Sequence, residues 1–217
     1  MKGNERISGT VIKRLPRYRR YLEELMHKKT GRISSGELSR LIGCTASQIR
    51  QDFNNFGGFG QQGYGYNIES LYQQINGILG LVREYKTVVI GAGNLGLAVA
   101  NYIYTYEDGF TVAGMFDVRP EIINTSANGV RIRGVSEIDD FLAEKQIDIG
   151  IITTPSANAQ QAADRLVKGG VKGIWNFAPV DLEIPEDVAV ENVHISDSLL
   201  SLAYYVNKTQ SQQDAEE

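Results

Sequence analysis

One stretch decides the fold of this sequence: Gly91-Ala92-Gly93-Asn94-Leu95-Gly96, which directly follows an apolar run at residues 87–90. In this G-x-G-x-x-G pattern the first glycine permits a tight turn, the second lets backbone amides approach a pyrophosphate, and the third lets the next helix pack closely on the strand. The anion would lie at the positive end of the helix dipole. The stretch therefore predicts a dinucleotide-binding turn, and its alternative interpretation is a turn with a purely structural role.

A second feature of the same site is Asp117, which ends the next predicted strand 21 residues after Gly96. A carboxylate in this place can accept hydrogen bonds from the adenosine ribose hydroxyls, and it repels a 2′-phosphate. Asp117 therefore favours NAD over NADP as the ligand, although the nearby Arg119 keeps NADP as an alternative.

The sequence around this site alternates strands with helices from residue 86 onward, which predicts a parallel sheet of the Rossmann type. Strands are expected at residues 87–90, 111–116, 129–133, 148–153, 173–177 and 188–193, and helices at 95–106, 135–145 and 158–168. Ligands of such sheets extend across the carboxyl ends of the strands. The residues expected there as nicotinamide walls are Thr153, Thr154, Pro155, Asn176, Phe177, Ala178 and Pro179, each of which has an ordinary loop role as its alternative.

The charge of the chain is divided unevenly along its length. Residues 1–67 hold 12 Lys and Arg against 5 Asp and Glu, whereas residues 68–217 hold 10 against 21. A net charge of +7 before a net charge of −11 indicates a basic module for a polyanion joined to an acidic module with another task. The alternative is a basic face that is only solvated.

The basic module carries the pattern of a helix-turn-helix. A helical stripe of apolar residues lies within residues 14–29, and Ser34 to Glu37 has the spacing of a capping box that starts a second helix ending at Gly43. The same spacing recurs from Thr45 to Gln48, so a third helix begins two residues after the second helix ends. Two helices joined by a tight turn with glycine predict a DNA-binding unit over residues 17–56.

The outward side of the third helix would present side chains that suit base edges and phosphates of a major groove. Residues 57–66 follow with five glycines and three aromatic residues, which predicts a wing, with a flexible linker as the alternative. The residues expected to contact DNA are Arg14, Arg17, Arg19, Ser34, Ser35, Thr45, Ser47, Gln48, Arg50, Gln51, Asn54 and Tyr64.

Composition excludes several other classes of protein. The chain has 217 residues, of which 42% are hydrophobic and 22% charged, as in ordinary globular domains. The longest apolar-rich stretch, residues 88–100, is shorter than the ~20 residues that cross a bilayer, and residues 1–10 lack the apolar core of a targeting segment. A single cysteine, Cys44, forms neither an internal disulfide nor a zinc site, so we expect a cytoplasmic protein without metal.

Candidates for catalysis are few. A dehydrogenase needs a positioned acid or base, and the two histidines, His27 and His194, lie in the basic helix and after the last strand. The pair Tyr204 and Lys208 has the Tyr-x-x-x-Lys spacing of short-chain dehydrogenases, but it follows the completed sheet, so we interpret it as a chance match. No stretch remains for a substrate domain, and we expect no enzyme.

The assembled pattern resembles the Rex family of redox-sensing transcriptional repressors. The resemblance covers nearly the whole chain and rests on motifs at residues 14–16, 32–35, 48–53, 56–57, 63–66, 91–96, 116–117 and 176–179. It implies an α/β protein with an N-terminal winged helix-turn-helix domain (residues 1–80), a C-terminal Rossmann-type parallel-sheet domain (81–195) and a C-terminal helix (196–208) swapped between the subunits of a homodimer. We expect residues 209–217 to be a disordered tail.

The resemblance further implies that NADH and NAD+ act as regulatory ligands and that NADH releases palindromic double-stranded operator DNA. Tyr102 and Arg20 resemble family residues that communicate the nucleotide state. His194-Ile195 stands where the family often has Asp followed by an aromatic residue, so an ion pair of Arg20 at that place is not implied. The competing hypotheses are a small NAD-dependent oxidoreductase with an incidental basic module and a nucleotide-gated structural dimer.

Overall fold

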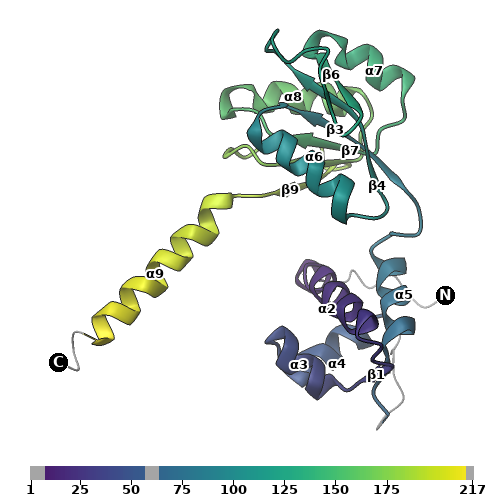
Figure 1. Ribbon diagram of the computed structural model, residues 1–217, viewed down its shortest axis with the longest axis vertical. Coiled ribbons are helices and arrows are strands. Elements are labelled where there is room, and N and C mark those ends of the chain that lie inside the picture. Colours follow the sequence, from purple (N-terminus) through teal and green to yellow (C-terminus); the bar gives the residue numbers. More distant parts are fainter. Residues whose placement is uncertain (1–7, 57–63, 214–217) are drawn as a thin grey trace. The chain divides into compact units, whose positions relative to one another are not determined.

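The computed structural model describes residues 8–56 and 64–213, which form parts of two compact units, residues 1–83 and 84–217 (Figure 1). The boundary lies three residues after the predicted one at residue 80. Each unit has its own hydrophobic core, so each is described by itself.

The N-terminal unit contains the predicted helix-turn-helix. Its capping box is present, because the Ser34 side chain accepts from the Glu37 N–H while the Glu37 carboxylate accepts from the Ser34 N–H. Gly43 ends that helix with a φ of 73°, in the left-handed region that favours glycine. The elements of the unit are α1 (Gly9–Ile12), α2 (Leu15–His27), β1 (Arg32–Ile33), α3 (Ser35–Ile42), α4 (Ala46–Asn54), β2 (Tyr66–Asn67) and α5 (Ile68–Ile78).

The core of this unit joins the helices to one another. Phe53 of α4 packs edge-to-face against Tyr18 of α2 and Tyr66 of β2, with ring centroids 5.2 and 5.1 Å apart. β1 and β2 pair antiparallel, Arg32 with Asn67 and Ile33 with Tyr66. The predicted wing extends beyond this pair into residues 57–63, which lie outside the described residues. The other fully or nearly fully buried members are Leu15, Leu22, Ile33, Leu38, Ile42, Ile49, Ile68, Leu71 and Ile75.

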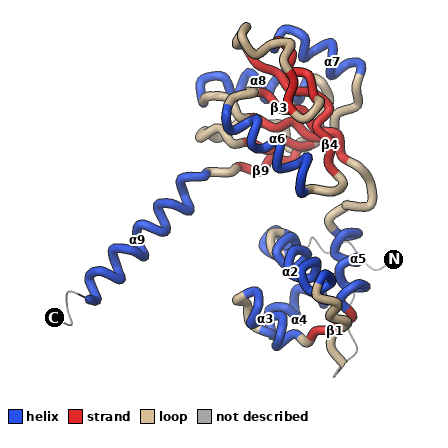
Figure 2. Tube along the Cα trace, viewed as in Figure 1, coloured by secondary structure: helices blue, strands red, loops and turns tan. Residues whose placement is uncertain are grey.

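The C-terminal unit is the predicted Rossmann-type sheet (Figure 2). Its strands lie in the order β5-β6-β4-β3-β7-β8-β9, all parallel to their neighbours except β5, which pairs antiparallel with β6. The strands are β3 (Tyr85–Ile90), β4 (Phe110–Asp117), β5 (Ser126–Ala127), β6 (Val130–Gly134), β7 (Ile149–Ile152), β8 (Gly173–Asn176) and β9 (Ala189–Asn192). The helices are α6 (Asn94–Tyr106), the 3-10 turn η1 (Val135–Glu137), α7 (Ile138–Glu144), α8 (Ser156–Lys168) and α9 (Ile195–Gln213).

Two cores lie on the two faces of this sheet because successive strand residues point to opposite sides. Val88 and Ile90 of β3 pack with α7 and α8, whereas Val89 between them packs with α6. Figure 1 shows α6 on one face of the sheet and α7 and α8 on the other. The strand order reverses between β3 and β7, and this switch point brings the carboxyl ends of β3, β4 and β7 together.

Several predicted bounds need correction. The sequence pattern missed the short elements α1, β1, β2 and β5. The final helix begins at Ile195 and continues to Gln213, so the prediction of a disordered tail is wrong for residues 209–213. Residues 214–217 lie outside the described residues.

Candidate nucleotide site and DNA-binding surface

A pocket of about 400 Å³ lies at the carboxyl ends of β3, β4 and β7. The glycine-rich turn and Asp117 form one side of it, and α7 and α8 contribute an apolar wall. The lining residues are Ile90, Gly91, Gly93, Asp117, Val118, Arg119, Val135, Ile138, Thr153, Thr154, Pro155, Asn158, Gln161, Ala162 and Arg165.

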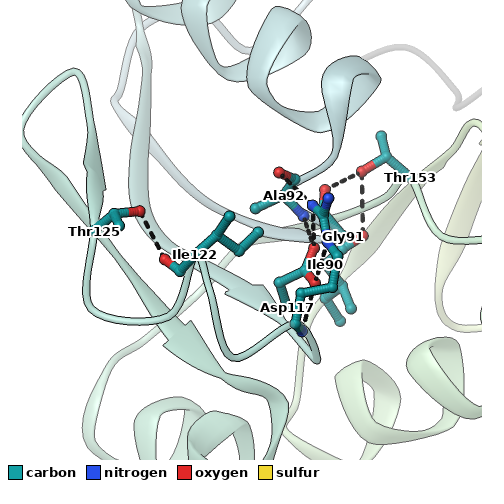
Figure 3. Close-up of polar contacts among 8 residues, drawn as sticks. Ile90, Gly91, Ala92, Asp117, Ile122, Thr125 and Thr153 are labelled. Carbon is teal, nitrogen blue, oxygen red and sulfur yellow. Dashed lines mark hydrogen bonds and ion pairs between the residues drawn. The ribbon is translucent and has the colours of Figure 1, made fainter.

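The glycine-rich turn is shaped by close backbone contacts that leave no room for side chains. Gly91 has a φ of 98°, and a Cβ there would lie 2.8 Å from the Thr153 carbonyl oxygen. A Cβ on Gly96 would clash with the Gly91 carbonyl oxygen and lie 2.7 Å from Thr153 Oγ1. The Thr153 hydroxyl donates to the Gly91 carbonyl at 2.7 Å, which ties the turn to β7 (Figure 3). The first and third glycines therefore have the roles that the sequence pattern predicts.

The Asp117 carboxylate is held at the end of β4 and is 6% exposed. It accepts from the backbone N–H of Ala92 at 2.8 Å and of Arg119 at 2.9 Å. The Arg119 guanidinium also donates to it, from Nε at 3.0 Å and from Nη2 at 3.2 Å. Burial alone would raise the pKa of Asp117, but these hydrogen bonds outweigh it and hold the pKa below its ordinary value.

The residues of this pocket fit a dinucleotide. At Gly93 a Cβ would meet only Arg119 Nη2, at 3.9 Å, so the turn leaves open space at this position. Helix α6, which has 13 residues, begins at the end of the turn with its backbone N–H groups toward it. Thr154 Oγ1 is buried without a hydrogen-bond partner among the described residues, so a ligand hydroxyl or phosphate oxygen can satisfy it. Six of the predicted nucleotide residues line the pocket: Gly91, Gly93, Asp117, Thr153, Thr154 and Pro155.

Other predicted nucleotide residues do not line the pocket. Ala92, Asn94, Leu95 and Gly96 belong to the turn and the start of α6. Phe177 packs against Trp175, with ring centroids 4.6 Å apart, and both belong to the α6 side of the sheet. Tyr102 lies on α6, 49% exposed, in ring contact with Tyr106.

The α7 and α8 wall of the pocket was not predicted. Val135, Ile138 and Ala162 contribute its apolar surface, while Arg165 is held by an ion pair with Asp139 at 3.0 Å. In the sequence these residues have the ordinary pattern of helix residues that pack against a sheet. No local pattern separates a helix residue that meets a ligand from one that meets the sheet.

The exposed side of α4 carries several of the predicted DNA contacts. Ser47, Arg50, Gln51 and Asn54 are exposed, and Arg50 Nη1 donates to the Ser35 hydroxyl at 3.0 Å. Thr45 caps the helix by accepting from the Gln48 N–H, and Tyr64 is 71% exposed beside the β1–β2 pair. These side chains form the α4 surface, defined as Ser35, Thr45, Ser47, Arg50, Gln51, Asn54 and Tyr64.

Arg14 and Gln48 have other partners than the sequence suggested. Arg14 donates from Nε and Nη2 to the carboxylate of the buried Asp52, and Gln48 Nε2 donates to the same carboxylate at 2.8 Å. Tyr18 adds a hydroxyl donor. The expected second capping box at Gln48 is therefore only half formed. In this structure Arg14 and Gln48 bind Asp52 inside the domain, and their contacts with DNA stay predictions.

Arg19 also turns inward. Its Nε donates to Asn76 Oδ1 of α5 at 3.0 Å, its guanidinium lies over the Tyr72 ring, and its side chain is only 16% exposed. In this structure Arg19 therefore links α2 to α5, and its phosphate contact stays a prediction. Ser34 is likewise engaged, in the capping box, whereas Arg17 and Arg20 are exposed on α2.

The described residues lack two other classes of site. Residues 8–56 and 64–213 contain no group of three or more His, Cys, Asp and Glu side chains that could hold a metal ion. Among the helices in that part of the chain, none combines the length and apolar character needed to cross a membrane. His194 is half-buried, and Tyr204 and Lys208 are exposed on α9.

Comparison with known proteins identifies both units. Residues 6–54 match a family model described as a putative DNA-binding protein N-terminus, and residues 82–180 match one described as a CoA binding domain. The redox-sensing transcriptional repressor Rex of Thermoanaerobacter pseudethanolicus is 53% identical over 208 residues, which cover 96% of this chain and 93% of that protein. The chain belongs to the Rex family.

Other Rex proteins extend this result. The Clostridium kluyveri Rex is 58% identical over 201 residues, 93% of this chain and 96% of that protein. The structure of RSP, a Rex-family repressor, superposes with a TM-score of 0.89 at 51% identity and covers 97% of this chain and all of RSP. The predictions of the family, of its redox-sensing repressor function and of the two-domain α/β fold are therefore confirmed.

RSP is also known with ligands. One structure is a complex with β-NAD+ and operator DNA (52% identity, TM-score 0.88, 98% of each chain covered). Another is a complex with β-NADH (50% identity, TM-score 0.88, 97% of this chain and 99% of RSP covered). These relatives are named as repressors.

Proposed function

We propose that this Rex-family chain acts as a cytoplasmic homodimer that binds palindromic operator DNA through the α4 surface and releases it when NADH occupies the pocket. The observation that carries the proposal is the presence in one chain of a capped helix-turn-helix and of a glycine-rich turn beside a buried Asp117. RSP supports both halves, since it has been seen with β-NAD+ and operator DNA and with β-NADH. In this proposal the nucleotide is a ligand and no chemical step occurs.

The contacts that discriminate the two redox forms belong near the nicotinamide. NADH and NAD+ share the adenosine and pyrophosphate groups and differ by one hydride and one positive charge, so the turn and Asp117 serve both alike. We assign the discriminating contacts to Thr154, Pro155 and Phe177, with Tyr102 on α6 as the residue that reports the nucleotide state to the rest of the dimer.

The dimer contact is assigned to α9. All its described side chains, residues 195–209, are exposed, and seven of them are large apolar residues. A soluble protein covers an apolar surface of this extent, and a second copy related by a two-fold axis is the simplest partner. Exchange of this helix between subunits is our proposal for its use. The seven residues are Ile195, Leu199, Leu200, Leu202, Tyr204, Tyr205 and Val206.

Reciprocal titration tests the proposal. If NADH weakens operator binding ~100-fold, the coupling free energy is about 2.7 kcal/mol, and operator must weaken NADH binding by the same factor. We expect NADH to bind more weakly to protein saturated with operator than to free protein, while NAD+ shows little difference. Equal NADH affinity in the two titrations contradicts a redox-gated repressor, and turnover of an alcohol or hydroxy acid with NAD+ would favour the oxidoreductase instead.

The Asp117→Ala variant is the matched control for this titration. Its ribose contact is common to both nucleotides, so we expect both to bind more weakly with an unchanged affinity ratio. Operator affinity without nucleotide should stay at the wild-type value, because Asp117 belongs to the other unit. A changed ratio would place the discrimination at the adenosine end of the ligand.

A further inference from the structure

The acceptor capacity of Asp117 is already used in the free protein. A carboxylate has two oxygens and about four lone-pair sites, and Asp117 accepts four hydrogen bonds. Two come from the backbone, at Ala92 and Arg119, and two come from the Arg119 guanidinium. A ribose with two free hydroxyls brings two further donors to a group that has no room for them.

Only the guanidinium can leave. The N–H of Ala92 belongs to the glycine-rich turn and that of Arg119 to the chain just after β4, so moving either would distort the site itself. The Arg119 side chain, by contrast, is 45% exposed and rests over the turn. Its Nη2 donates to the Ala92 carbonyl at 3.1 Å and lies 3.9 Å from where a Gly93 Cβ would stand.

We propose that Arg119 sets the selectivity of the adenosine end by competing with an unphosphorylated ribose for Asp117. The inference rests on the proposed function, in which NAD(H) binds this pocket. NADH and NAD+ carry the same ribose, so displacing the guanidinium reduces the affinity of both by the same factor. Arg119 thus lowers nucleotide affinity without altering the response to redox state.

A ribose with a 2′-phosphate meets Arg119 differently. It has no 2′-hydroxyl to donate to Asp117, and the carboxylate repels it. Within residues 8–56 and 64–213, Arg119 Nη1 has no hydrogen-bond partner, so the guanidinium can stay on Asp117 and still offer this nitrogen to the phosphate. Arg119 therefore raises the affinity for NADPH and lowers the affinity for NADH, so it reduces the ratio by which NADH is preferred.

The test is the affinity of the Arg119→Ala protein for four nucleotides, measured on the full chain by calorimetry without DNA. An ion pair with a half-exposed partner is weak, so we expect NADH and NAD+ to bind about two- to fivefold more tightly, by the same factor. NADPH and NADP+ should bind no more tightly than to the wild type. Arg119→Lys keeps the charge but loses the bidentate geometry, so its NADH affinity should lie between those of the wild type and of Arg119→Ala.

Two controls separate this role from a general effect. Arg131→Ala removes the same charge from an exposed side chain of the same unit, hydrogen-bonded to Asn124 outside the pocket lining, and should change nothing. In an Asp117→Ala background, Arg119→Ala should add no tightening, because the competed group is gone.

Unchanged NADH binding by Arg119→Ala overturns the inference, because displacing the guanidinium then costs no affinity. Weaker NADH binding also overturns it, because Arg119 then contacts the nucleotide. An equal gain for NADPH overturns the assigned selectivity. If the wild-type protein binds no NADH, the proposed function fails and the inference fails with it. If the wild type binds NADH and only the Arg119 result differs from expectation, the inference about Arg119 is wrong and the proposed function is unaffected.

Discussion

Arg14 and Asp52, which lie 38 residues apart in the sequence, form an ion pair with two hydrogen bonds of 2.6 Å. Asp52 is fully buried on the inner side of α4, and Arg14 immediately precedes α2. A buried carboxylate without partners is costly, so this pair fixes how α4 lies against α2. The ion pair on the inner side of α4 therefore determines which of its side chains face outward.

Removal of Arg14 should destabilise the N-terminal unit. Arg14→Ala leaves the Asp52 charge buried, and breaking such a pair costs about 3–5 kcal/mol, reduced here because the Arg14 side chain is 23% exposed. Hydrogen exchange resolves the effect by unit: amides of α2 and α4 should lose protection while those of β3 and β4 keep theirs. Arg17→Ala, at an exposed position of α2, is the matched control. Equal protection in the two variants would contradict a stabilising role for the pair.

The same pair predicts the acid sensitivity of the unit. Burial raises the pKa of Asp52, but hydrogen bonds from Arg14, Tyr18 and Gln48 outweigh it, so the folded pKa lies below the ordinary value of about 3.9. A depressed pKa adds stability above the unfolded value, and that stability is lost as the pH falls through the folded value. Unfolding free energy measured in urea should therefore fall as the pH drops below the ordinary carboxyl pKa of about 3.9, and Asp52→Asn should flatten this dependence.

Arg50 should matter for sequence recognition. It is exposed on α4, and Arg50→Ala should cost roughly 1–3 kcal/mol of specific operator binding if it reads a base edge. Fluorescence anisotropy with operator and with scrambled DNA measures the difference. NADH affinity should be unchanged, and a parallel loss of it would point to a defect in folding rather than in recognition.

Arg17 should matter for DNA of any sequence. As an exposed cation on α2, it is expected to neutralise a phosphate, so Arg17→Ala should weaken operator and scrambled DNA alike. The slope of log affinity against log salt should become smaller by about 1. Arg19→Ala makes the comparison sharper, because its guanidinium is held by α5: its removal leaves the slope at the wild-type value if that link persists on DNA, and lowers it if the predicted phosphate contact forms. A normal slope for Arg17→Ala would remove it from the phosphate contacts.

The apolar residues of α9 should hold the dimer. Leu199→Glu together with Leu200→Glu places two charges on a surface that is 67–68% exposed in the single chain, so they are tolerated in a monomer and costly in an interface. Analytical ultracentrifugation should show monomers. Deletion of residues 196–217 should give monomers or aggregate. A stable, soluble dimer from the deleted protein would contradict the exchange of α9.

The elements that sequence could predict are those whose signals are local. The Ser34–Glu37 capping box, Gly43 and the turn from Gly91 to Gly96 each specify their conformation within six residues, and each has the expected geometry. Helix α9 was predicted too, but its end was not, because polar residues after Lys208 continue a helix as readily as they leave one.

The parts that sequence missed depend on partners far along the chain. Arg14, Arg19 and Arg17 look alike in a basic helix, yet Asp52 holds the first, Asn76 the second, and only the third faces solvent. The charge of a sequence predicts that it binds a polyanion, but it does not predict which arginine makes the contact. Likewise Asp117 was predicted as a ribose acceptor from its spacing, whereas the guanidinium on it is visible only once β4 is folded.

The contact between Trp175 and Phe177 has an optical consequence. Trp175 is the single tryptophan of the chain, and its ring packs on a residue that we assign to the nicotinamide wall. Reduced nicotinamide absorbs light in the range in which tryptophan emits, and oxidised nicotinamide does not. Excitation of Trp175 should therefore be passed to bound NADH and appear as nicotinamide emission, while bound NAD+ gives no such signal. The protein would thus carry its own unlabelled readout of the redox form in its pocket.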